Sequence, residues 1–64
     1  MTEQWLYDYY MNRLRLAAEE FVQHSQLAHE ITEPTMHHQL QQARQYDIDC
    51  MLALCRRIKQ MKQQ

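Results

Sequence analysis

The chain has 64 residues, with no glycine, a single proline and a formal net charge of −1. A chain of this length forms one domain and cannot bury a thick core by itself. Its near-neutral charge gives no overall field toward nucleic acid or acidic membranes, and no apolar run reaches the roughly 18–20 residues of a membrane-spanning helix. We therefore expect a small cytoplasmic protein without membrane segments.

Residues 3–31 are predicted to form the first helix, because their apolar residues recur at helical spacing. The polar His24 falls on the same line. The apolar stripe consists of Leu6, Tyr10, Leu14, Ala17, Phe21, Ala28 and Ile31.

Residues 32–35 (Thr32-Glu33-Pro34-Thr35) are the predicted break. Proline is not tolerated inside a helix but suits its first turn. Pro34 could therefore begin the second helix or directly precede it, with Thr32, Glu33 or Thr35 as the cap. The sequence leaves these choices open.

Residues 36–61 are predicted to form the second helix, again with one stripe along it. Asp47 is the one polar residue at the centre of that stripe, and a buried carboxylate needs a partner. We expect an ion pair with His24, with a contact to another chain as the alternative. The stripe consists of Met36, Leu40, Ala43, Asp47, Cys50, Met51, Leu54, Ile58 and Met61.

A short break makes the two helices antiparallel, so facing residue numbers should sum to about 67. Leu54 then faces Leu14, and Cys50 faces Ala17. One uninterrupted helix is the competing structure, and Pro34 argues against it. The predicted fold is an all-α, antiparallel two-helix hairpin over residues 1–64, completed by oligomerisation or by a partner protein.

Apolar residues beyond the two stripes would remain on both broad sides of such a hairpin. Trp5, Leu16 and Leu27 are spaced by eleven residues, which stacks them along one edge, and the antiparallel fold places Tyr46 beside them. A second row, containing Tyr7, Met11, Ala18 and Val22, should share the other side with Ile48, Leu52 and Cys55. The predicted partner-binding residues are Trp5, Tyr9, Leu16, Leu27, Tyr46, Ile48 and Leu52.

No pattern in the chain indicates catalysis, a cofactor or a metal site. The four histidines lack the spacing at which two imidazoles share an ion on one helix, and His37 and His38 should be exposed or lie at an interface rim. Cys50 and Cys55 are five residues apart on a helix, so they point away from each other. They should be reduced and act as small, buried or half-buried apolar residues. We expect the protein not to be an enzyme.

The segment from Thr35 to Ile58 resembles the second helix of the YscE-like co-chaperones of type III secretion. The resemblance rests on two runs, His37-His38-Gln39-Leu40-Gln41-Gln42-Ala43-Arg44 and Asp49-Cys50-Met51-Leu52-Ala53-Leu54-Cys55. It implies a cytosolic helical hairpin that, with a helical-repeat chaperone, holds the needle subunit unassembled before export. The break differs, because Thr32-Glu33-Pro34 stands where the family commonly has a glycine.

Two functions therefore remain open from the sequence. The first is a small helical co-chaperone that binds and stabilises another helical protein. The alternative is a homodimeric four-helix-bundle regulator, which could bind nucleic acid through its basic residues. Those residues are Arg44, Arg56, Arg57, Lys59 and Lys62.

Overall fold

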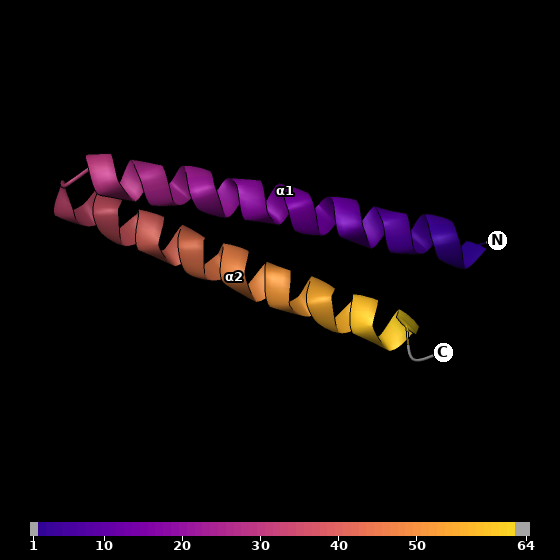
Figure 1. Ribbon diagram of the computed structural model, residues 1–64. Helices are drawn as coiled ribbons and strands as arrows, with labels where there is room; N and C mark the ends of the chain where they lie inside the picture. Colours follow the sequence, from indigo (N-terminus) through magenta and orange to yellow (C-terminus); the bar gives the residue numbers. More distant parts are fainter. Residues whose placement is uncertain (1, 63–64) are drawn as a thin grey trace.

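The computed structural model describes the backbone of residues 2–62 and the side chains of residues 3–61. Helix α1 spans Thr2–Glu30 and helix α2 spans Pro34–Lys62, each 29 residues long. The helices run antiparallel, with the break at one end of the molecule and both termini at the other (Figure 1). The predicted all-α hairpin is confirmed.

The break covers only residues 31–33, and α2 begins two residues earlier than the predicted Met36. The reason is the N-terminal cap. The Glu33 carboxylate accepts hydrogen bonds from the backbone N–H of Thr35 (3.2 Å) and of Met36 (2.8 Å). Pro34 fits between them because the first helical position needs no N–H donor. Glu33 is thus the cap, and Pro34 is the first residue of the helix.

The two predicted stripes line the seam between α1 and α2. Ala28 and Ile58 are the most deeply buried apolar residues among those described, at 6% and 8% exposed. The other stripe residues are half-buried, with two exceptions: Asp47 is fully buried, and Met36 is exposed. The prediction for Met36 is therefore wrong.

His37 takes the inner position beside the break. Its Nδ1–H donates to the Ile31 carbonyl (3.1 Å), and its Nε2 accepts from the Gln41 side chain (3.2 Å). Adjacent residues on a helix point about 100° apart, so Met36 is turned outward. His37 is consequently half-buried, against the expectation of an exposed side chain, whereas His38 is exposed as expected.

The hairpin is a rod of 49 × 14 × 11 Å. Its radius of gyration is 14.8 Å, compared with about 11 Å for a compact domain of this length. Its accessible surface is 5304 Å², whereas a folded monomer of this mass usually exposes about 4,400 Å². Two helices of this length therefore cover each other poorly.

Candidate protein-interaction surfaces

The centre of the seam is polar. Asp47 is 2% exposed, and His24 Nδ1–H donates to its Oδ2 across the helices at 2.6 Å. The predicted partnership of His24 and Asp47 is confirmed. Because a buried carboxylate is costly without a donor, this contact favours one alignment of α1 against α2.

Two broad faces flank the seam, and both carry exposed apolar side chains. Of the seven predicted partner-binding residues, six are between 37% and 68% exposed, and Ile48 is half-buried. We name the first face the Leu16 face; it carries Trp5, Tyr9, Leu16, Leu27 and Tyr46. We name the second the Leu52 face; it carries Met11, Val22, Ile48 and Leu52.

A groove of about 490 Å³ opens on the Leu16 face between the helices. Leu16 and Ala17 line it from α1, and Tyr46 and Cys50 line it from α2. The structure thus brings Leu16 and Tyr46 to the same side, as the antiparallel prediction required. Asp47 also borders the groove, so the buried carboxylate lies next to this open surface.

Two opposite charges, Arg13 and Glu20, also line the groove. Neither forms an ion pair with another described residue of the chain. Both act on Tyr46, whose pKa is raised mainly by a hydrogen bond to the Cys50 side chain. The negative charge of Glu20 raises the pKa of Tyr46 further, and Arg13 opposes it. The groove therefore presents an unpaired cation and an unpaired anion beside an exposed aromatic ring.

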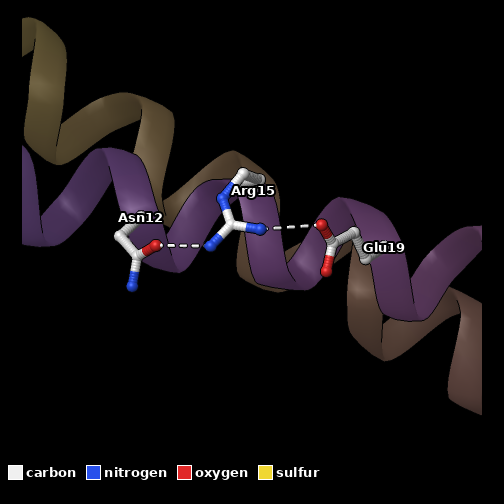
Figure 2. A network of polar contacts seen from close by, with 3 residues as sticks. All are labelled: Asn12, Arg15 and Glu19. Atoms are coloured by element: carbon white, nitrogen blue, oxygen red, sulfur yellow. Dashed lines mark hydrogen bonds and ion pairs between the residues drawn. The ribbon is translucent and has the colours of Figure 1, made fainter.

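The charges on the side of α1 away from α2 are paired within the helix (Figure 2). Arg15 donates to Glu19 at 2.8 Å and to Asn12 at 2.7 Å. The Arg15 and Glu19 side chains are 60% and 55% exposed, so this network is a solvated i, i+4 pair of small energetic value. It offers no unpaired charge to a partner.

The Leu52 face carries a cation–π contact between the helices. The Arg44 guanidinium lies over the Phe21 ring, 5.3 Å from its centroid, and donates to Gln41 at 2.8 Å. This cation–π contact was not predicted, although 21 and 44 fit the expected register. Val22, the residue after Phe21 on α1, borders two shallow apolar hollows. This face therefore has an exposed apolar row and, near the break, a smaller hollow of about 330 Å³ between the helices. The hollow is lined by Ser25, Ala28 and His29 of α1 and by His37, Gln41 and Arg44 of α2.

The remaining candidate residues do not converge on a site. The described side chains contain no group of three or more His, Cys, Asp or Glu residues that could hold a metal ion. Cys50 is half-buried and Cys55 is exposed, so the expectation of a buried or half-buried residue is wrong for Cys55; both thiols are free. Arg56, Arg57 and Lys59 are exposed on α2, and the side chain of Lys62 lies outside the described residues.

Comparisons with known proteins add no relative. No protein-family model, curated protein or solved structure matches the chain. Neither described helix is long and apolar enough to cross a bilayer. The exposed apolar rows make the two broad faces the candidate functional surfaces.

Proposed function

We propose that this protein is a helical interaction protein that binds and stabilises another helical protein. The observation that carries the proposal is the distribution of apolar side chains. Nine large apolar residues are exposed, whereas only Ala28 and Ile58 among the described apolar residues are deeply buried. A hairpin with this distribution has much apolar surface left for a partner to cover.

The energetic argument follows from the exposed side chains. Burying one Leu- or Trp-sized side chain gains roughly 1.5–3 kcal/mol, and a whole small domain is stable by only about 5–15 kcal/mol. A partner that binds only the folded hairpin also stabilises it by mass action. Binding and folding would therefore support each other.

The shape of the faces favours a helix as the bound element. A groove between two antiparallel helices can accept the apolar row of a third helix, as in helix-in-groove recognition. The resemblance of residues 35–58 to YscE-like co-chaperones supports the same direction, with a helical-repeat chaperone as partner. In this proposal the protein functions in the cytoplasm, where it keeps a secretion subunit unassembled before export.

Capture experiments with matched variants test this proposal. The full wild-type chain is compared with Leu16→Asp, Leu52→Asp and the control Gln60→Asp. Each of the three variants changes one exposed residue and adds one negative charge. The wild type and the control should retain the same helical protein from a native lysate, identified by mass spectrometry. The purified partner should then raise the melting temperature of the hairpin.

Loss of capture in Leu16→Asp or Leu52→Asp identifies the face that the partner covers. The proposal fails if no helical protein is retained by the wild type. It also fails if both face variants retain the partner as well as the control does.

A further inference from the structure

The apolar row on the Leu16 face is symmetric about its own centre. Trp5 and Leu27 lie eleven residues on either side of Leu16, and Leu16 is the middle residue of α1. Eleven residues make nearly three whole turns, so the row stays on one edge. Two copies of α1 laid antiparallel, Leu16 on Leu16, would bring Trp5 of each copy onto Leu27 of the other.

The unpaired charges follow the same symmetry. Arg13 and Glu20 lie about equally far from the middle of α1, in opposite directions along it. In an antiparallel pair, Arg13 of one copy lies beside Glu20 of the second copy, and the contact occurs twice. The two residues are two turns apart within one chain, too far to pair with each other. The Leu16 face thus carries both halves of a charge pair that only another molecule can complete.

We propose that the Leu16 face binds a second copy of this chain, forming an antiparallel four-helix bundle. The two-fold axis lies in the interface beside Leu16 and runs across the rod, so α1 packs on α1 and α2 packs on α2. Such a self-complementary contact is the commonest form of dimer interface. The face combines large exposed apolar residues with the two opposite charges that line its groove.

The second helix fits the same axis. Because the groove is lined by both Ala17 and Cys50, the residue of α2 level with Leu16 is close to Met51. Tyr46 and Arg57 lie on the same edge of α2, about equally far from that level. The axis therefore brings Tyr46, which is 68% exposed, next to Arg57 of the second copy, where a cation–π contact can form.

The size of the face is sufficient for a stable dimer. The broad side of the rod measures 49 by 14 Å. Full overlap of two copies would remove on the order of 1,400 Å² from solvent, within the 1,200–2,000 Å² of standard interfaces. Because the axis passes beside the middle of α1, the overlap extends along the whole helix.

A second face-to-face arrangement is possible, in which the two-fold axis runs along the length of the rod. It places α1 of one copy on α2 of the second copy. Arg13 would then lie within about one turn of Arg57, and Glu20 would lie opposite Tyr46. This arrangement brings like charges together and leaves Glu20 without a cation. The charges therefore favour the arrangement that pairs α1 with α1.

This inference goes beyond the proposed function, because it assigns one face to self-association and leaves the Leu52 face free for a foreign helix. Sedimentation equilibrium of the full chain tests it. The wild type should sediment at twice its 7.9 kDa, and Leu52→Asp should remain dimeric. Leu16→Asp should be monomeric with unchanged helical content by circular dichroism.

A charge exchange tests the arrangement at exposed positions where folding is not at risk. Arg13→Glu and Glu20→Arg should each weaken the dimer at least about threefold, because each creates two like-charge contacts. The double variant should recover wild-type affinity, since the pair is restored in reverse. A matched exchange of Arg15 and Glu19 should leave the dimer unchanged, because that pair lies on the far side of α1.

The proposal is overturned if the wild type is monomeric, or dimerises more weakly than a Kd of about 1 mM. It is also overturned if the double variant dimerises no better than the single ones. Capture of a foreign helical protein through Leu52 is independent of both results, so the two proposals fail separately.

Discussion

The seam between the helices and the two broad faces differ in how well their apolar residues are covered. The seam is thin and in part polar: among the described residues only Ala28, Ile58 and Asp47 are deeply buried, and Asp47 is bonded to His24. The faces carry the tryptophan and two exposed tyrosines. In a self-sufficient domain the large apolar residues would be inside. The contrast indicates that the seam aligns the two helices, while the large apolar residues of the faces stay uncovered by the chain itself.

The largest expected effect comes from removing apolar volume from the seam. Ile58→Ala should lower the free energy of unfolding by about 2–5 kcal/mol, since Ile58 is 8% exposed. Leu52→Ala is the matched change on a face. Because Leu52 is 50% exposed, this variant should lose well under half as much unfolding free energy as Ile58→Ala. Urea denaturation of both variants measures the difference. Equal losses of unfolding free energy would mean that the faces contribute as much to folding as the seam does.

An intermediate effect is expected at the polar centre of the seam. His24→Ala leaves the buried Asp47 carboxylate without its donor, which should cost about 1–3 kcal/mol of unfolding free energy. Replacing both partners, as in His24→Ala with Asp47→Leu, should recover most of that loss, because no buried charge remains. If the double variant is as unstable as His24→Ala, the seam depends on the ion pair itself.

The smallest expected effect concerns the cap at the break, which belongs to neither the seam nor the faces. Hydrogen bonds from the backbone N–H of Met36 and of Thr35 hold the pKa of Glu33 below its ordinary value of 4.5. A lowered pKa in the folded state means stabilisation that is present above the unfolded pKa and lost as the pH falls through the folded one.

Glu33→Gln should therefore lower the melting temperature slightly near neutral pH, and the difference should shrink in acid as Glu33 of the wild type becomes protonated. Melting curves of both proteins at about pH 7 and about pH 2 make the comparison. A difference that persists unchanged in acid would show that the carboxylate charge does not contribute to the cap.

Much of the seam was predictable because helical spacing alone fixes which side chains share a line. The stripes, the antiparallel register and the partnership of His24 with Asp47 all follow from that spacing. The start of α2 could not be predicted from spacing. Thr32, Glu33 and Thr35 are all plausible caps, and only the folded backbone distinguishes them. Met36 and His37 exchanged their expected exposures for the same reason.

The apolar rows of the two faces could be predicted from the sequence, but their grooves and side-chain contacts could not. Residue spacing placed Leu16 and Tyr46 on one side and Leu52 on the other. It could not show that Arg44 lies over Phe21 on one face, because the position of a long flexible side chain depends on its neighbours in three dimensions. It also could not show the groove on the opposite face. Which molecule covers each face stays a prediction.

The elongated shape has a consequence for how the molecule moves through a gel-filtration column. A rod of 49 × 14 × 11 Å has a larger hydrodynamic radius than a sphere of the same mass, so a single hairpin elutes earlier than a globular standard of 7.9 kDa. Two rods packed side by side gain thickness rather than length, so their elution shifts less than their mass does. Elution volume alone would therefore not distinguish a monomer from a dimer, whereas light scattering or sedimentation would.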